Sequence, residues 1–545
     1  MKLLPFSVCL LSAAVISACG GSGGSSEDAN LAPQATSVLI RYDTSKTLYT
    51  GATLEGRYGY SDTEQDAEGA SRFRWLVDGE VKSTEQNYTL QRADGGKDIV
   101  FEVTPVATTG TLSGAAVQSD AVQAVTRDYV PFTAMISENE RVTLITDGTE
   151  QGTVMVSDFN SSEAKENIRE SVRLGDRWLV TVDINGSANQ LAVIDGTEQG
   201  SVVIGDGEFN NLQPSSLVTF NNKVFFAGTD DSNDRELWSS DGTADGTQLF
   251  VNLSPGNQAS NTPNKGAPHN FVVIDDNTMI FSAYGTTTGT EPWVTNGRDG
   301  TSMIKDINGT SQGSITSGYF SALGKGFFTY AADLWVTSGV GSQTHVLRNQ
   351  GPQDVVRYAE LNGKVLLVAD DDNEASCAGL WISDGTAEGT QYIDSRTDGD
   401  CIQEIVATDD AVYYTTSTVL YRYTETAGVT AMNGTQYGMS ELIALGNQLL
   451  FKANDGNGYG LYTVNGNDIT LVKQVTNLTT FNAMTDLILL NDEIIFQADD
   501  GVHGRELWHS DGTEAGTQLL KDILPGSESS ELILCHLKGQ NLCRV

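Results

Sequence analysis

The chain is short of positive charge. Its 545 residues include 32 lysines and arginines against 71 aspartates and glutamates, a formal net charge of −39. Nucleic-acid binding needs clustered basic residues to displace the counterions of phosphate, and docking on anionic lipid needs the same residues. Both classes of partner are therefore disfavoured. Only five histidines are present, which limits metal and acid–base chemistry but leaves carboxylate-based catalysis open.

Proline and long apolar runs are scarce as well. Eleven prolines argue against a proline-rich stalk, whereas 57 glycines indicate many tight turns. The apolar segment 3–16 is shorter than the roughly 20 residues of a membrane-spanning helix and has the length of a signal-peptide core. The hydrophobic share of 39% is still enough for a packed core. The length fits about two to four average domains, or a repeat array with a smaller module.

The N-terminus has the features of an export signal, and residues 1–18 are the expected signal peptide. Residues 16–19 read Ile-Ser-Ala-Cys, which resembles the lipobox of bacterial lipoproteins. The resemblance implies that Cys19 is lipidated and that acyl chains hold the protein on a membrane. It also implies the outer membrane, because Gly20 replaces the aspartate that retains such proteins at the inner membrane. A plain secretory signal with a chance cysteine is the alternative.

Four further cysteines indicate disulfides, because an exported chain with an even number of cysteines is typical of paired ones. They are Cys377, Cys401, Cys535 and Cys543. Four cysteines allow three pairings, and proximity in the sequence favours Cys377–Cys401 and Cys535–Cys543. A zinc site is the alternative, but the chain has no C-x-x-C motif and no histidine at ligand spacing.

Residues 34–128 predict an immunoglobulin-like β-sandwich. They follow residues 19–33, a Gly/Ser-rich segment that is typical of a flexible tether. Short alternating runs of strand-forming residues are separated by turn signals, and Trp75 lies where such domains bury a tryptophan. The segment from Gly51 to Leu76 resembles Ig-like modules of bacterial surface proteins.

One loop of this segment is a candidate calcium site. Its carboxylates recur at every second position, and they are Asp62, Glu64, Asp66 and Glu68. Such spacing can gather oxygen ligands around Ca²⁺. A solvated acidic loop is the favoured interpretation, since Glu64 stands where related modules often have aspartate.

Residues 129–545 contain an internal repeat. An Asp-Gly-Thr-x-x-Gly-Thr pattern recurs along the chain, and its copies begin at Asp147, Asp195, Asp241, Asp384 and Asp511, with a degenerate copy at Asn296. The first two spacings, 48 and 46 residues, match one propeller blade. Each unit has strand-like runs without helical periodicity, so the segment predicts a β-propeller of about eight to nine four-stranded blades. A last run, Leu532–Leu537, is expected to pair with the incomplete first unit and close the ring.

The repeats also carry a family resemblance. Residues 505–517 read Arg-Glu-Leu-Trp-His-Ser-Asp-Gly-Thr-Glu-Ala-Gly-Thr. They resemble the ELWxxDGT repeat of bacterial secreted and surface proteins, as do residues 236–247 and 380–390. This family is defined by its repeat and has no agreed activity, so the resemblance implies a propeller and no particular chemistry.

The repeated residues predict structure rather than chemistry. Asp-Gly is a favoured hairpin turn, which assigns a turn role to Asp241, Asp384 and Asp511. One equivalent strand position holds a tryptophan in five units, and these are Trp238, Trp293, Trp335, Trp381 and Trp508. Packing between blades is the favoured interpretation. A sugar-stacking surface is the alternative, and it would need exposed rings.

Acidic loops precede this strand position in several units. They include Asp230, Asp231, Asp499 and Asp500. These residues are candidate calcium ligands or else solvated turns, and calcium is the only cofactor that the sequence suggests.

The sequence names no catalytic residue, because it holds no P-loop, dinucleotide fingerprint or c-type haem motif. We expect an envelope-anchored lipoprotein that acts as a non-enzymatic binding or adhesion module for protein or polysaccharide at the cell surface. One alternative is a periplasmic scaffold for envelope assembly. Another is a carbohydrate-active propeller enzyme, which predicts carboxylates converging at one mouth of the ring.

Overall fold

The computed structural model describes residues 30–534 with short gaps. The gaps are residues 45, 111, 158, 160–165, 185–186, 206–211, 230–233, 256–265, 311–312, 315, 349–350, 371–377, 395–399, 435–436 and 477–482. Within these limits the chain is all-β apart from two short 3₁₀ turns, η1 (Arg92–Asp94) and η2 (Gly341–Gln343). It forms two compact units that meet between Arg127 and Asp128. The described residues contain no helix with the length and apolar character of a membrane span.

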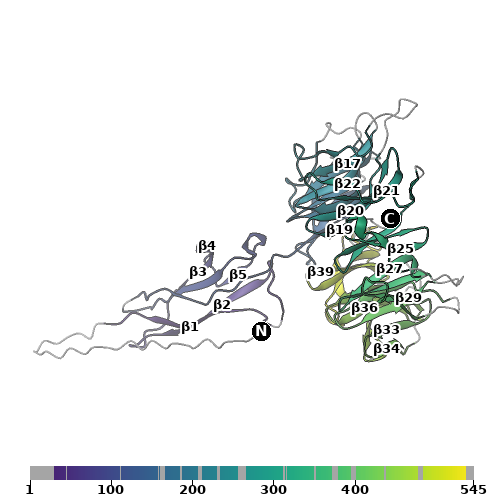
Figure 1. Cartoon of the computed structure of the whole chain (residues 1–545). Helices are drawn as coiled ribbons and strands as arrows, with labels where there is room; N and C mark the ends of the chain where they lie inside the picture. Colours follow the sequence, from purple (N-terminus) through teal and green to yellow (C-terminus); the bar gives the residue numbers. More distant parts are fainter. Residues whose placement is uncertain are drawn as a thin grey trace, which may run out of the picture. The chain divides into compact units, whose positions relative to one another are not determined.

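The first unit is a sandwich of two antiparallel sheets, which confirms the Ig-like prediction (Figure 1). One sheet comprises β1 (Gln34–Arg41), β2 (Thr53–Ser61) and β5 (Asn87–Thr89), and the other β4 (Glu80–Ser83), β3 (Arg72–Val77), β6 (Ile99–Thr104) and β7 (Val117–Gln118). Trp75 is fully buried between the sheets, with its ring centroid 5.1 Å from that of Phe101 and 5.8 Å from that of Tyr88. Its indole Nε1 donates a hydrogen bond to the Glu85 carbonyl, 3.1 Å away.

The second unit is a β-propeller whose described strands form nine four-stranded antiparallel blades. This number agrees with the upper end of the predicted range. The fifth and sixth blades are joined into one continuous sheet by a single bridge between Asp333 and Gln353.

The strands of each blade follow one another in the chain, except in the first blade. Blades one to three comprise β43 (Ile533–Leu534), β8 (Val130–Ser137), β9 (Glu140–Thr146) and β10 (Val154–Ser157); β11 (Glu166–Leu174), β12 (Arg177–Ile184), β13 (Ser187–Ile194) and β14 (Val202–Val203); and β15 (Ser215–Phe220), β16 (Lys223–Thr229), β17 (Arg235–Ser240) and β18 (Gln248–Val251). Blades four to six comprise β19 (His269–Asp275), β20 (Thr278–Gly285), β21 (Gly289–Thr295) and β22 (Thr301–Met303); β23 (Ser317–Ala322), β24 (Lys325–Tyr330), β25 (Asp333–Thr337) and β26 (His345–Val346); and β27 (Gln353–Leu361), β28 (Lys364–Asp370), β29 (Gly379–Ser383) and β30 (Gln391–Asp394). Blades seven to nine comprise β31 (Glu404–Ala407), β32 (Val412–Thr415), β33 (Leu420–Thr424) and β34 (Gly428–Ala431); β35 (Tyr437–Leu445), β36 (Gln448–Asn454), β37 (Tyr459–Asn465) and β38 (Asp468–Gln474); and β39 (Met484–Leu490), β40 (Glu493–Asp499), β41 (Arg505–Ser510) and β42 (Gln518–Lys521).

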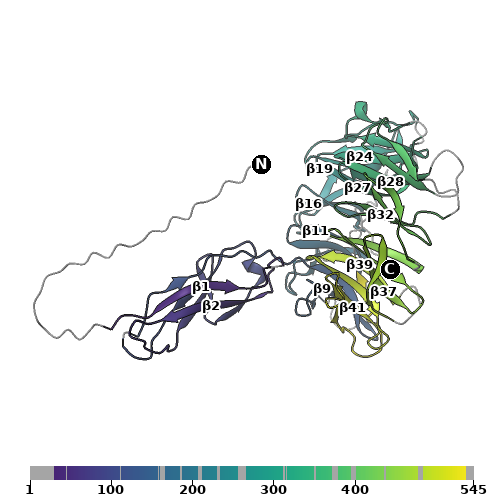
Figure 2. The same cartoon turned by 90° about the horizontal axis from the view of Figure 1, so that it is seen from below.

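The C-terminal strand β43 completes the first blade. It pairs antiparallel with β8, placing Ile533 opposite Thr133 and Leu534 opposite Phe132. This pairing confirms the expected closure for the described part of the closing segment. A buried apolar cluster joins the first blade to the ninth and includes Phe132, Leu144, Ile488, Leu507 and Leu534. The strands β9 and β39 contribute to this cluster, and β11 of the second blade packs against β9 on its other side (Figure 2).

A recurring hydrogen bond joins the turns of neighbouring blades. A side chain at the turn between the first two strands of one blade donates to a backbone carbonyl in the Asp-Gly-Thr turn, or its equivalent, of the next blade. We call this contact the turn bond. The turn bonds run from Arg177 Nη2 to Asp241 O (3.2 Å), from Asn221 Nδ2 to Asn296 O (2.7 Å), from Lys325 Nζ to Gly385 O (2.9 Å), from Gln448 Nε2 to Gly512 O (3.2 Å) and from Asn491 Nδ2 to Asp147 O (2.9 Å).

The Asp-Gly-Thr turn is held by its own side chains. At Asp511, one carboxylate oxygen accepts hydrogen bonds from the backbone N–H (3.1 Å) and the hydroxyl (2.6 Å) of Thr513. Gly512 has φ +83°, a left-handed conformation that favours glycine. A Cβ on Gly516 would lie 1.9 Å from the Asp511 carboxylate, so the second glycine is a steric requirement. Asp241 and Asp384 make the same two bonds in their blades.

Removing part of the closing strand is expected to weaken the whole ring. Leu534 is 3% exposed, so Leu534→Ala leaves a cavity between the first and ninth blades and should cost roughly 2–4 kcal/mol of stability. Thermal unfolding measures this loss as a lower midpoint. Leu489→Ala is the matched control, because Leu489 is 48% exposed and its truncation should change stability by about 0.5 kcal/mol or less. Equal shifts in the two variants would contradict the assigned closure.

Candidate functional site

The five repeated tryptophans lie within or beside the blade junctions. Trp381 and Trp508 are buried, at 5% and 8% exposed, in the apolar clusters of the fifth–sixth and eighth–ninth junctions. Trp238 and Trp293 are half-buried against the second–third and third–fourth junctions. Trp335 is half-buried as well and stacks on Phe328, with 6.1 Å between ring centroids. A sugar-stacking surface would need these rings to be open to solvent, which their burial disfavours.

The acidic loop of the first unit uses its carboxylates for separate hydrogen bonds. Asp62 Oδ1 accepts from the backbone N–H groups of Glu64 (3.0 Å) and Asp66 (3.1 Å), which forms a local turn. The other carboxylates accept from different parts of the unit: Glu64 from Leu31 N (3.2 Å), Asp66 from Asn30 Nδ2 (2.8 Å) and Glu68 from Tyr58 OH (2.5 Å). Each carboxylate therefore already has protein donors.

The acidic loops of the propeller are only partly described. Asp230 and Asp231 lie outside the described residues. Asp499 accepts from Gly501 N at 2.8 Å, and Asp500 Oδ2 lies 2.8 Å from the Nδ1 of His503. Among the described residues, no group of three or more His, Cys, Asp or Glu side chains is arranged to hold a metal ion. Calcium binding stays a prediction.

The cysteine predictions fall largely outside the described chain. Cys19, Cys377, Cys535 and Cys543 are not among the described residues. Cys401 is described and is disulfide-bonded. The pairings expected from proximity, and the lipidation of Cys19, stay predictions.

The structure assigns a role to glutamates that the sequence analysis did not single out. Glu236, Glu291 and Glu506 precede the repeated tryptophan by two residues and are at most 1% exposed. Each carboxylate accepts backbone N–H groups from the linker that leads out of its own blade. For Glu236 the donors are Leu253 N (2.7 Å) and Gly266 N (2.8 Å), and for Glu291 they are Ile307 N (3.0 Å) and Ser314 N (2.9 Å). Through these hydrogen bonds, the three glutamates fix the linkers between blades, an arrangement that we call the linker clamp.

Glu506 shows the electrostatics of this clamp. It accepts hydrogen bonds from the Ile523 N–H (2.9 Å) and the Ser530 hydroxyl (3.0 Å). Burial raises its pKa to about 7 against the opposing effect of these bonds. A carboxyl group with such a pKa in a cleft is a candidate catalytic acid. Glu506 is instead fully buried and bonded to its linker, as Glu236 is, so neither side chain is open to a substrate.

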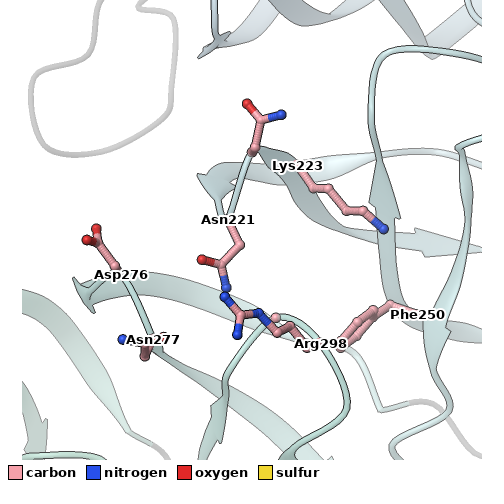
Figure 3. A pocket seen from close by; sticks show the side chains of 8 residues that line it. Asn221, Lys223, Phe250, Asp276, Asn277 and Arg298 are labelled. Atoms are coloured by element: carbon pink, nitrogen blue, oxygen red, sulfur yellow. The ribbon is translucent and has the colours of Figure 1, made fainter.

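A polar cavity of about 590 Å³ opens between the third and fourth blades (Figure 3). The third blade contributes one turn and its outer strand β18 to the lining, and the fourth blade contributes two turns. Packing of the two blades brings these segments together. The lining residues are Asn221, Asn222, Lys223, Phe250, Asp276, Asn277, Gly297 and Arg298. The cavity thus combines amides, two cations and one carboxylate with an aromatic ring, which is the mixture that orients a polar ligand.

Local sequence explains the shape of the lining turns. Asn221 and Asn222 both have positive φ, 51° and 57°, as a two-residue hairpin turn requires, and asparagine tolerates this conformation. The turn of the fourth blade is the degenerate copy that begins at Asn296, and it is one residue shorter than the others. Asn296 Oδ1 accepts N–H groups from Arg298 (2.9 Å) and from Asp299 (3.1 Å).

The described residues offer the two cations of the cavity no ion-pair partner. Neither Lys223 nor Arg298 forms a salt bridge with any residue in the described part of the chain. The pKa of the neighbouring Asp241 is lowered mainly by the hydrogen bond from Thr243 and to a smaller extent by the positive charge of Lys223. With Asp276 as the one carboxylate in the lining, the cavity has a positive balance within an acidic protein.

No protein-family model matches the chain, and no curated protein matches it. Solved structures with similar folds include a puromycin hydrolase (11% identity, TM-score 0.32, covering 56% of this chain and 53% of that one). Others are AztD of Citrobacter koseri (8% identity, TM-score 0.38, 73% and 96%) and BamB of Moraxella catarrhalis (11% identity, TM-score 0.33, 59% and 93%). The chain spans about half the length of the puromycin hydrolase structure. At these levels of likeness, the function has to be argued from the chain's own residues.

Replacing Glu506 by glutamine is expected to reduce the pH dependence of stability. Its folded-state pKa of about 7 exceeds the ordinary value of 4.5, so the ionised carboxyl opposes folding. The contribution of Glu506 to the stability of the protein should be most favourable below about pH 4.5 and should decrease as the pH rises towards about 7. Urea unfolding at about pH 5 and about pH 8 should show a smaller loss for Glu506→Gln than for the wild type.

The matched control is Glu514→Gln, which alters an exposed glutamate in the following turn. Its loss of stability between the two pH values should equal that of the wild type. The same loss in Glu506→Gln as in the wild type would show that burial does not raise the pKa of Glu506.

Proposed function

We propose that this protein is a non-enzymatic binding module of the bacterial envelope, and that its propeller binds polysaccharide through the cavity between the third and fourth blades. The polar lining of this cavity is the observation that supports the proposal. Amides and a carboxylate suit the hydroxyl groups of a sugar, and the Phe250 ring offers an apolar face for its C–H groups.

The shape of the site favours a saccharide over a protein partner. A stable protein interface buries roughly 800 Å² on each side around an apolar centre. The cavity is instead open to solvent and lined mainly by polar residues, and its volume of about 590 Å³ is too small for a protein surface of that size but large enough for a saccharide unit. A protein ligand is therefore an outcome of the test below rather than the proposal.

Binding is favoured over cleavage for a chemical reason. Glycoside hydrolysis usually needs a pair of carboxyl groups that flank the bond to be broken. The cavity lining supplies one, Asp276. The buried glutamates described above are committed to the linkers, so they do not supply the second.

The proposed location rests on the N-terminal sequence. The lipobox-like residues 16–19 support lipidation of Cys19 and attachment to the outer membrane, with the Ig-like unit as a spacer. Cys19→Ala should move the protein from the membrane fraction to the soluble fraction, because the acyl anchor would be lost. Fractionation of cells that express each form measures this shift. Retention of the variant in the membrane fraction would count against lipid anchoring.

Truncating one amide of the cavity is expected to weaken saccharide binding. Asn222→Ala removes one polar group from the lining and should reduce affinity roughly 3- to 10-fold in isothermal titration against envelope polysaccharides. The matched control is Asn362→Ala, because Asn362 has the same left-handed conformation (φ 52°) in the equivalent turn of the sixth blade. Equal affinities for both variants, or capture of a protein partner without any glycan binding, would overturn the proposal.

A further inference from the structure

The third blade differs from the second and the fifth in the use of the cation that begins its second strand. Arg177, Lys325 and Gln448 each begin the second strand of a blade, and each makes the turn bond to the next blade. Lys223 begins the second strand of the third blade. There the turn bond comes from Asn221, two residues earlier, as it comes from Asn491 in the ninth blade, where Glu493 begins the second strand. The ammonium group of Lys223 is thereby released from the turn bond and lines the cavity.

The turn of the fourth blade that begins at Asn296 also differs from the other repeat turns. In the Asp-Gly-Thr turns the third residue is a threonine whose hydroxyl bonds within the turn, as Thr243 and Thr513 show. In the degenerate turn the third residue is Arg298. Its side chain is exposed and reaches the cavity beside Asn221 (Figure 3). Both departures from the repeat therefore place a cation in one cavity.

These two charges belong to an acidic protein. The chain has more than two acidic residues for every basic one, 71 against 32, and several of its cations are paired within the fold. Arg141, Arg169 and Arg422 form ion pairs. Lys223 and Arg298 have no ion pair with a described residue. The carboxylate of the adjacent Asp299 instead accepts a hydrogen bond from Asn296 Nδ2, 3.1 Å away.

We infer that the cavity selects anionic saccharides, with Lys223 and Arg298 supplying the positive charge that attracts acidic groups of the sugar chain. This inference rests on the proposed function and names the class of polysaccharide. A guanidinium group donates two parallel hydrogen bonds to a planar carboxylate, and an ammonium group adds a point charge. Asn222, Asn277 and Asp276 remain for the hydroxyl groups, so the lining offers partners for both the acidic and the hydroxyl groups of a uronate chain.

The decisive comparison uses one sugar chain with and without its charge. Oligogalacturonate and its carboxyl-reduced, neutral form have the same length and linkage, and a sulfated neutral oligosaccharide provides a second anion. Isothermal titration with the full mature chain is expected to give roughly 10- to 100-fold tighter binding of the carboxylated form than of the neutral one. The difference should shrink as salt is added.

The variant test separates charge recognition from folding. Lys223→Met combined with Arg298→Met should abolish the preference for the charged form, so that the carboxylated and neutral forms bind this variant with affinities within about 2-fold of each other. The control is Lys364→Met, which removes the lysine at the equivalent position of the sixth blade, where it pairs with Glu425 at 3.1 Å. This control should keep the full preference.

Each outcome bears on one of the two proposals. Tighter binding of either acidic form that is lost in the double variant supports the inference, and the two acidic forms show whether carboxylate or sulfate is read. Equal binding of charged and neutral forms overturns the inference and leaves the saccharide function standing. Absence of binding to all three saccharides overturns the proposed function itself.

Discussion

The propeller depends on each blade burying both faces of its sheet against its two neighbours. The apolar clusters run from blade to blade, and the cluster between the ninth and first blades completes the series. A four-stranded sheet with one open face would be unstable in water, so the interior of each blade exists only because the ring is closed. The short pairing of β43 with β8 therefore supports contacts throughout the ring.

Local features of the repeat were predictable from sequence, whereas long-range ones were not. The turn at Asp511 follows from bonds within two residues and from one left-handed glycine, so its pattern alone indicates its structure. Glu506 looks like any surface acid in the sequence, because its partners Ile523 and Ser530 lie 17 and 24 residues further along. The number of blades followed from the repeat spacing, but units with a degenerate repeat motif limited the prediction to eight or nine.

The cavity could not be predicted, because it forms where turns 75 residues apart meet. Its two cations look unremarkable in the sequence, since lysine and arginine stand at similar positions in other units. They stand out only when their contacts are compared with those of other basic residues. Lys305 and Lys521, for example, donate to the backbone carbonyls of Thr344 and Thr153 in the next blade. A basic residue that leaves such a contact becomes available to a ligand. Divergence of one repeat unit thus produces a site without a new fold.

The position of β43 has a consequence for synthesis. Ile533 pairs with Thr133, so the first blade lacks its first strand until the chain has been synthesised at least as far as Ile533. Until then the nascent protein presents the unpaired edge of β8, which can template pairing with other chains. A stop codon before Ile533 would therefore leave this edge unpaired and yield an aggregation-prone open array instead of a slightly smaller ring.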